Sequence, residues 1–280
     1  MQRTADLHLH SVYSDGLYTP DEICRIAKRT GLYLISITDH DTLNGEEEKC
    51  EAAKRQGLRY VSGWEVSAYQ NKSQIHVLGY GCQRGDAYLA FLENRKKAAM
   101  ERAKDSVEKF RAIGVPVTLE LVLSKRKDET APVHTMHIAR AAADFLGLNE
   151  GEVYRRYLAR GMPANSGIGR PTPFEAIDCI HASGGVAVVA HPGRIRMDRE
   201  EKKEVLDRLA DYGVDGIETY YTTHTDEETE YFRAYAEERG LFVTGGSDTH
   251  YQERTHVIGR PQYVIDEKFL QLLEEKGKIL

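Results

Sequence analysis

Ala5-Asp6-Leu7-His8-Leu9-His10 is the stretch on which the rest of the chain is organised. It reads as a buried strand over residues 4–9, and successive side chains of a strand point to opposite faces. His8 and His10 therefore share one face and Leu7 and Leu9 the other. Two imidazoles at this spacing can hold one metal ion without a bend in the backbone. Such a pair is common by chance, so its meaning depends on the other segments.

Strands and helices alternate through most of the chain. Further strands are expected at 33–38, 59–66, 74–80, 186–190, 214–218 and 241–244. Helices are expected at 20–30, 45–56, 88–113, 134–146, 150–159, 172–183, 199–212, 226–239 and from about 267. Thr19 is the expected N-cap of the first helix. This alternation predicts parallel strand pairing, and parallel α/β barrels gather their functional residues at the carboxyl ends of the strands.

Histidines and carboxylates recur in the predicted strands and just after them. The candidate metal ligands are His8, His10, Asp15, His40, Glu65, His76, His191, Asp248 and His250. Imidazole and carboxylate donors together suit Zn²⁺, Mn²⁺ or Fe²⁺. These groups are too many for one ion, so they predict two to three divalent ions that share bridging ligands. Closely spaced cations can bind a bridging hydroxide at neutral pH and clamp a phosphoryl group.

Several of these residues also have an ordinary structural interpretation. His76 fits a hydrogen-bonded core histidine, Asp15 a turn and Asp248 a helix cap. Glu65, beside Trp64 in a strand, is harder to explain, because an unpaired buried carboxylate is costly. The joint occurrence of all the candidates favours the metal site.

Other polar residues near the strand ends leave two interpretations open. Asp6 fits either a role in orienting His8 or a purely structural role. For Glu218, a structural role is slightly favoured over a place in the site. Asp39 alternates away from His40 and is expected to hydrogen-bond locally. Tyr221 fits either a substrate wall or an ordinary loop.

The strand–helix rhythm breaks in the middle of the chain. We expect residues 1–99 and 168–280 to form the α/β domain and residues 100–167 to form a helical insertion that acts as a substrate lid. One predicted helix carries His134, His137 and Arg140 within two turns. These side chains fit either a binding site for a substrate anion or a solvent-exposed helix face. Arg194 follows His191-Pro192-Gly193 and is placed to bind a phosphate.

Composition restricts the partners. The net charge of −6 argues against a broad nucleic-acid-binding surface, so no stable nucleic-acid complex is expected. No apolar run is long enough for a membrane span, and no signal peptide is apparent. The four cysteines form no C-x-x-C pair, which is typical of reduced thiols in a cytoplasmic protein. Nothing in the pattern indicates an oligomeric state.

The ordered motifs resemble those of the polymerase and histidinol phosphatase (PHP) family of metal-dependent phosphoesterases. They are Asp6-Leu7-His8-Leu9-His10-Ser11, Thr38-Asp39-His40-Asp41, Gly63-Trp64-Glu65, the His76 strand, Ala190-His191-Pro192-Gly193 and Gly246-Ser247-Asp248-Thr249-His250. The resemblance implies a distorted (β/α)7 barrel with a trinuclear metal centre.

By this resemblance, the ligands divide into three sets. His8, His10, Glu65 and Asp248 would hold one ion; Glu65, His76 and His191 a second; Asp15, His40 and His250 a third. Some members have a histidine where this chain has Asp15, and this difference concerns the affinity and the identity of the third metal ion. A hydroxide between the ions, held by His8, His10, Glu65, His76, His191 and Asp248, would attack phosphorus.

The long middle segment resembles that of the RNase AM/TrpH-like group. Those proteins act on 5′-nucleotides, nucleoside 3′,5′-bisphosphates and short RNA from its 5′ end, so a small phosphorylated substrate, a nucleotide, is expected. Among the alternative functions, hydrolysis of cyclic ribose phosphates ranks second and hydrolysis of histidinol phosphate ranks third. A non-catalytic PHP scaffold is disfavoured because every ligand position is filled. An amidohydrolase is disfavoured because no lysine stands late in a strand as a metal bridge.

Overall fold

The fold is that of a computed structural model, which describes residues 3–70, 73–126, 133–159, 161–251 and 256–280. The chain divides into two compact units, one of residues 1–88 with 172–280 and one of residues 89–171. The sequence placed this division at 99/100 and 167/168. In the structure the first boundary falls earlier, at 88/89, because most of the long helix that begins at Asp86 belongs to the second unit, and the second boundary falls later, at 171/172.

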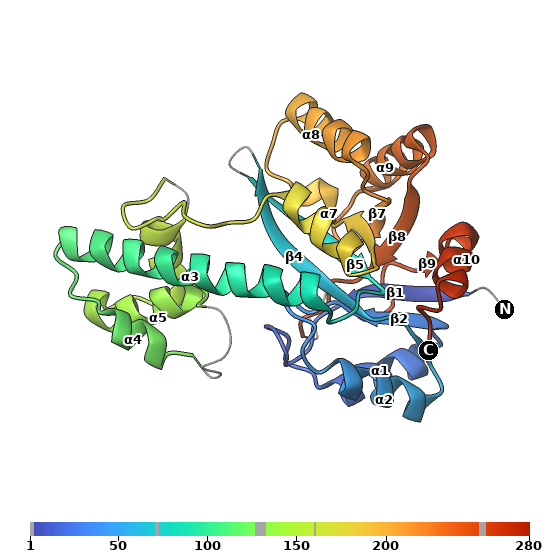
Figure 1. The fold of residues 1–280 in the computed structure, drawn as a ribbon, viewed down its shortest axis with the longest axis horizontal. Coiled ribbons are helices and arrows are strands. Elements are labelled where there is room, and N and C mark those ends of the chain that lie inside the picture. The colour runs from blue at the N-terminus through green and yellow to red at the C-terminus, as the bar shows by residue number, and fades with distance from the viewer. Residues whose placement is uncertain (1–2, 71–72, 127–132, 160, 252–255) are drawn as a thin grey trace. The chain divides into compact units, whose positions relative to one another are not determined.

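The strands of the first unit form two mixed sheets (Figure 1). Their bounds are β1 Thr4–Leu9, β2 Leu34–Ile37, β3 Arg59–Tyr60, β4 Gly63–Gln70, β5 Ser73–Tyr80, β6 Val186–Val189, β7 Gly216–Tyr221, β8 Phe242–Gly246 and β9 Tyr263–Val264. The first sheet has the order β3-β2-β1-β9 and the second β4-β5-β6-β7-β8. The sequence had not predicted β9.

The prediction of parallel pairing throughout is wrong. β1, β2 and β3 pair in parallel, as do β6, β7 and β8, but β4/β5, β5/β6 and β1/β9 are antiparallel. Only Asn71 and Lys72 separate β4 from β5. A parallel connection needs a crossover of a dozen residues or more, so this pair can only form a hairpin.

The strand expected over 59–66 is two strands. β3 ends at Tyr60 in the first sheet, and β4 begins at Gly63 in the second. The chain passes between the sheets at Gly63, where a Cβ would lie 2.4 Å from Ser36 Oγ. Two isolated parallel bridges also link the two sheets: Leu9 of β1 pairs with Thr249, which follows β8, and His40, which follows β2, pairs with Glu65 of β4.

Helices cover the sheets of the first unit. They are α1 Pro20–Thr30, α2 Glu46–Gln56, α7 Pro173–Ala182, α8 Arg199–Tyr212, α9 Asp226–Arg239 and α10 Glu267–Glu275, with a 3₁₀ turn at Pro192–Arg194. Thr19 caps α1 in a capping box with Glu22, as predicted. Among the described residues, no helix has both the length and the apolar composition that a bilayer crossing requires.

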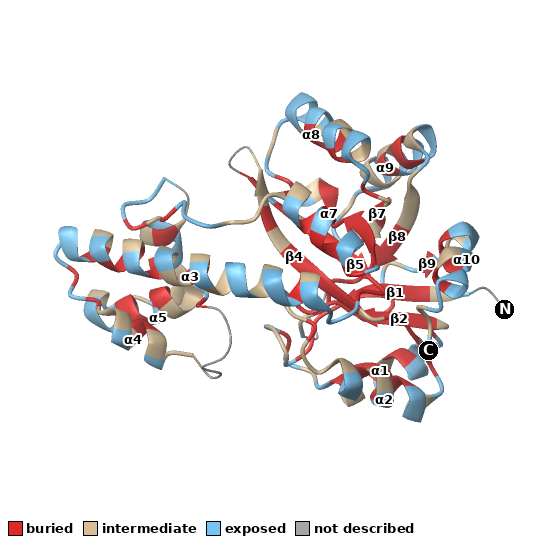
Figure 2. Cartoon of the chain, viewed as in Figure 1, coloured by how far each residue is buried: buried red, intermediate tan, exposed pale blue. Residues whose placement is uncertain are grey.

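Two apolar clusters stabilise the first unit. One joins strands of both sheets to α10 through residues such as Leu7, Leu78 and Phe269, and the other lies under α1 and α2. The residues of β1 and β2 are almost all buried (Figure 2). The strand ends that carry the candidate ligands are therefore anchored in the best-packed part of the unit.

The second unit is helical. It contains most of α3 Asp86–Ala112, then α4 Leu119–Ser124, α5 Thr135–Leu146, α6 Glu150–Val153 and a π-helical turn at Tyr154–Leu158. The sequence had not predicted α4, and the helix expected over 150–159 changes from α to π winding at Tyr154. This unit has its own apolar core, which includes Phe110, Ile138 and Val153.

Because each unit has a separate core, the two should respond separately to core damage. Phe110→Ala removes a fully buried ring of the helical unit and should cost about 3–5 kcal/mol of unfolding free energy in urea titrations. Metal uptake by the first unit should be unchanged. Ile113→Ala, at a 44% exposed position of the same segment, is the control and should cost under about 0.5 kcal/mol. If metal binding by Phe110→Ala fell together with its unfolding free energy, the two units would not respond separately to core damage.

Candidate metal centre

The carboxyl ends of several strands supply imidazoles and carboxylates to one place. His8 lies on β1 and His10 directly after it, and both side chains are fully buried. His40, His191 and Asp248 lie two or three residues after the ends of β2, β6 and β8. Among the described residues, positive φ outside glycine occurs at Asp41 (57°), His191 (27°) and Asp248 (53°). Such conformations are costly and gather at functional sites, and here they accompany the candidate ligands.

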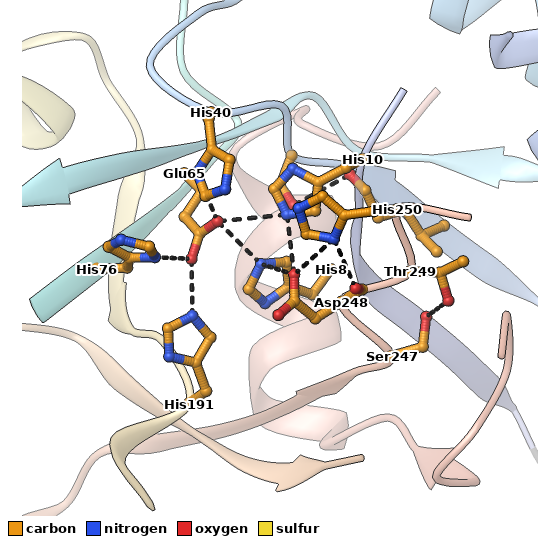
Figure 3. Close-up of polar contacts among 12 residues, drawn as sticks. His8, His10, His40, Glu65, His76, His191, Ser247, Asp248, Thr249 and His250 are labelled. Carbon is orange, nitrogen blue, oxygen red and sulfur yellow. Dashed lines mark hydrogen bonds and ion pairs between the residues drawn. The ribbon is translucent and has the colours of Figure 1, made fainter. Parts of the chain in front are cut away.

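Glu65 lies at the centre of this group (Figure 3). Its Oε1 is 2.7 Å from His76 Nδ1 and 2.9 Å from His191 Nε2.

The second oxygen of the same carboxylate faces other imidazoles. Glu65 Oε2 lies 3.0 Å from His40 Nδ1, 3.2 Å from His8 Nε2 and 3.3 Å from His10 Nε2. One fully buried carboxylate thus faces imidazoles from four other segments of the chain, with a separate set at each oxygen.

The close donor groups have a composition that suits cations. Within each group, one nitrogen or oxygen of every residue lies within 4.8 Å of those of the others: His8, His10, Glu65 and Asp248; His10, Asp15, His40 and His250; His40, Glu65 and His76. His191 joins them through its contact with Glu65. Asp15 is the most exposed member, with 58% of its side chain accessible, and lies 3.3 Å from His250 Nε2.

The site passes a simple test for a bound cation. Six of its buried atoms have no hydrogen-bond partner among the described residues: His8 Nε2, His10 Nδ1, His10 Nε2, His40 Nδ1, Glu65 Oε2 and Asp248 Oδ1. Burial of so many polar atoms without partners is costly. Nitrogen and oxygen donors without thiolate suit zinc, manganese or iron, so the residues present fit divalent metal ions.

Electrostatics keeps the carboxylates of the site ionised. Burial alone would raise the pKa of Glu65, but the surrounding imidazoles, His76 foremost, hold that pKa well below its usual value. The pKa of Asp248 is lowered in the same way by His8 and His10, against the effect of burial. Both groups can therefore act as anionic ligands at neutral pH.

Glu218, for which sequence reasoning slightly favoured a structural role, orients two candidate ligands. Its Oε1 lies 2.9 Å from His8 Nδ1, and its Oε2 accepts a hydrogen bond of 2.7 Å from the His191 backbone N–H. Glu218 is fully buried on β7. A carboxylate on the far nitrogen of a ligating histidine fixes the tautomer and ring orientation. Its place at the same strand-end rim was the available signal.

Asp6 orients the site through the backbone. It accepts hydrogen bonds from the backbone N–H groups of His8 (3.3 Å), Ser247 (3.0 Å) and Gly259 (2.8 Å). Burial raises the pKa of Asp6 to about 6, against these hydrogen bonds. Asp6 therefore ties the strand that carries His8 to the turn that carries Asp248.

Two sequence expectations about the positions of these residues are corrected. Glu65 lies near the start of β4 rather than at a strand end, because the strand expected over 59–66 is divided and β4 runs on to Gln70. His76 lies inside β5, as expected for the strand over 74–80. Asp39 does not hydrogen-bond locally: it accepts from the Ser11 N–H and Oγ, each at 2.7 Å, across 28 residues of sequence.

The predicted substrate-binding residues lie in both units. In the first, Arg194 Nη1 is 2.8 Å from Tyr221 Oη and 3.2 Å from Asp248 Oδ2. In the second, the guanidinium of Arg140 pairs with Glu150. His137 lies in the first turn of α5, where its Nδ1 accepts from the His134 N–H at 3.1 Å, and burial lowers the pKa of His137 to about 4.

Comparison with known proteins identifies the family. The PHP domain model matches residues 6–216. A solved structure named as an amidohydrolase from Chromobacterium violaceum, with bound sulfate and no metal, is 28% identical, with a TM-score of 0.79 over 99% of this chain and 97% of that one. A candidate metal-dependent phosphoesterase from Bifidobacterium adolescentis is 27% identical, with a TM-score of 0.76 over 96% and 95%. The chain belongs to the PHP domain family.

Curated relatives are similar over most of their length. A 3′,5′-nucleoside bisphosphate phosphatase of Chromobacterium violaceum is 30% identical over 88% of this chain and 86% of that protein. A 5′-3′ exoribonuclease of Haemophilus influenzae is 29% identical over 90% and 91%. A phosphoribosyl 1,2-cyclic phosphate 1,2-diphosphodiesterase of Eggerthella lenta is 29% identical over 88% and 93%.

Glu218→Gln tests the orienting carboxylate. A glutamine offers one acceptor oxygen, whereas His8 and His191 present two donors, so one donor would face an amide NH₂. Metal affinity, measured by calorimetric titration with Mn²⁺, should fall about 10–100-fold while the fold is kept. Glu238→Gln, at an exposed position of α9, is the control. Unchanged affinity in the Glu218 variant would rule out the orienting role.

Proposed function

We propose that this metal-dependent phosphoric ester hydrolase of the PHP domain family releases phosphate from nucleotide monoesters. The substrates would be 5′-nucleotides, nucleoside 3′,5′-bisphosphates and short RNA attacked from its 5′ end. The observation that carries the reaction class is the Glu65 carboxylate with a separate set of imidazoles at each oxygen. The nucleotide preference is supported by the relatives named as a bisphosphate phosphatase and an exoribonuclease.

Two to three divalent ions, Mn²⁺, Zn²⁺ or Fe²⁺, are proposed for the centre. His8, His10, Glu65 and Asp248 would hold one; Glu65, His76 and His191 a second; Asp15, His40 and His250, with His10 beside them, a third. When bound, such ions supply a nucleophile from water at neutral pH and stabilise the charge that develops on a phosphoryl group.

Residues of the chain would complete the reaction site. The Arg194 side chain is 55% exposed but held at one end by Asp248 and Tyr221, so its guanidinium can bind a phosphate oxygen without large reorganisation. Burial and the nearby Asp248 raise the pKa of Tyr221, so its hydroxyl keeps its proton and donates to Asp248 Oδ2 at 2.8 Å. Asp248 then presents its other oxygen, Oδ1, to His8 and His10.

We further propose that the two sheets form the distorted (β/α)7 barrel of the family, with residues 100–167 as a helical insertion that serves as the substrate lid. The two bridges that join the sheets support the barrel. His134, His137 and Arg140 of the insertion are proposed to bind substrate anions. Arg140 would then have to exchange its pairing with Glu150 for a phosphate.

A panel of phosphate esters tests the proposal. With Mn²⁺ added, the chain should release phosphate from adenosine 5′-monophosphate and adenosine 3′,5′-bisphosphate. Chelation should reduce the rate by at least about 100-fold, and added metal should restore it. Glu65→Gln is the control for contaminating phosphatases. No release from any ester by the metal-loaded protein would exclude a phosphoesterase.

The same panel separates a second candidate function. Hydrolysis of a ribose 1,2-cyclic phosphate is favoured by the similarity to the Eggerthella lenta diphosphodiesterase. Faster turnover of the cyclic ester than of either nucleotide would make it the better assignment. Histidinol phosphate, which ranks third, belongs in the panel as well.

Arg194→Met tests the anion-binding residue. The value of kcat/KM for the best ester should fall at least about tenfold, which corresponds to about 1.4 kcal/mol. Metal content should be kept, because Arg194 contacts Asp248 Oδ2 and the imidazoles face Oδ1. Arg208→Met, at an exposed position of α8, is the matched control. Unaltered kinetics in the Arg194 variant would remove this residue from the site.

A further inference from the structure

A buried ion pair lies beside the metal centre, outside the ligand sets. Lys49 Nζ on α2 is 2.7 Å from Asp39 Oδ2, and both side chains are fully buried. A buried lysine is rare unless it is paired. Burial would raise the pKa of Asp39, but the charge and hydrogen bond of Lys49, together with His10 and the Ser14 hydroxyl, hold that pKa below its usual value, so the carboxylate stays ionised.

Asp39 binds the turn that follows β1. It accepts hydrogen bonds from the Ser11 N–H, the Ser11 hydroxyl and the Ser14 hydroxyl, each at 2.7 Å. The turn is closed by the Ser14 N–H and Gly16 N–H, which both donate to the Ser11 carbonyl at 3.1 Å. Asp15 is the residue between these two donors.

Lys49 and its helix also contact the turn directly. The Lys49 ammonium lies 5.8 Å from the centroid of the Tyr13 ring. The Tyr13 hydroxyl donates to Glu48 at 2.5 Å, and a Cβ on Gly45 would lie 2.1 Å from the same ring. The start of α2 is therefore shaped to hold this turn.

The ion pair is linked to each member of one donor group. Asp39 immediately precedes His40, and Ser11 immediately follows His10. The Leu17 N–H, at the end of the same turn, donates to the His250 carbonyl at 2.8 Å. Together with Asp15, these residues make up the close donor group of His10, Asp15, His40 and His250.

We propose that Lys49 is a positioning residue for the third metal ion. It offsets the burial of the Asp39 carboxylate, which in turn holds the turn that presents Asp15 beside His10, His40 and His250. The inference rests on the proposed metal centre and adds to it a residue that binds neither metal nor substrate. Loss of the Lys49 charge would weaken the hold of Asp39 on the turn and leave the other two ligand sets intact.

Lys49→Met removes the charge and keeps most of the apolar stem. Metal per chain is measured by elemental analysis after equilibrium dialysis against a series of Mn²⁺ concentrations. The wild-type chain should take up three ions. In Lys49→Met the weakest-bound ion should need at least about tenfold more Mn²⁺, with uptake of the other two unchanged. High Mn²⁺ should restore the third ion.

Ser14→Ala provides a second, milder variant, since it removes one donor to Asp39 and leaves the buried pair in place. It should weaken the third ion in the same direction without lowering the melting temperature. Lys54→Met, in an exposed pair with Glu51 on the same helix, should change nothing. Ala53→Gly is the control for a general loss of stability in Lys49→Met. It should destabilise α2 without changing either residue of the Lys49–Asp39 pair.

Three results would overturn the inference. One is full affinity for the third ion in both Lys49→Met and Ser14→Ala. Another is an equal loss of that ion in Ala53→Gly, because general loosening of α2 would then explain it. Uptake of only two ions by the wild-type chain would remove the third site while leaving a two-ion phosphoesterase. Uptake of none would overturn both the inference and the proposed function.

Discussion

The structure depends on the burial of one carboxylate among imidazoles from distant parts of the chain. Glu65 is fully buried, and its two oxygens face His76 and His191 on one side and His8, His10 and His40 on the other. An uncompensated buried carboxylate is strongly unfavourable. The neighbouring imidazoles have buried nitrogens without hydrogen bonds, so the cluster as a whole is arranged for cations rather than for internal pairing.

A second layer of carboxylates holds this cluster in place. Glu218 positions His8 and the backbone at His191, and Asp6 joins β1 to the turn that carries Asp248. Asp39, with Lys49 behind it, holds the turn that carries Asp15. Each of these acids is buried and satisfied by donors from another segment. The ligands are therefore fixed by long-range contacts, as preorganised metal sites require.

Local patterns predicted much of this arrangement. Alternation along β1 placed His8 and His10 on one face, and the ends of β2, β6 and β8 supplied further candidates that the structure brings together. The hairpin of β4 and β5 was missed because the strands were expected over 59–66 and 74–80, which hid the two-residue connection, and parallel pairing was extended to this pair. The role of Glu218 was left open, with a structural role slightly favoured, because its partner, His8, lies 210 residues away and the sequence pattern does not show that pairing.

Anomalous X-ray diffraction from crystals grown with Mn²⁺ tests the central claim most directly. The account predicts anomalous peaks in contact with both oxygens of Glu65, one shared with His8 and His10 and another with His76 and His191. A well-ordered structure in which these side chains contact no metal at saturating Mn²⁺, or in which the ions lie elsewhere, would contradict it.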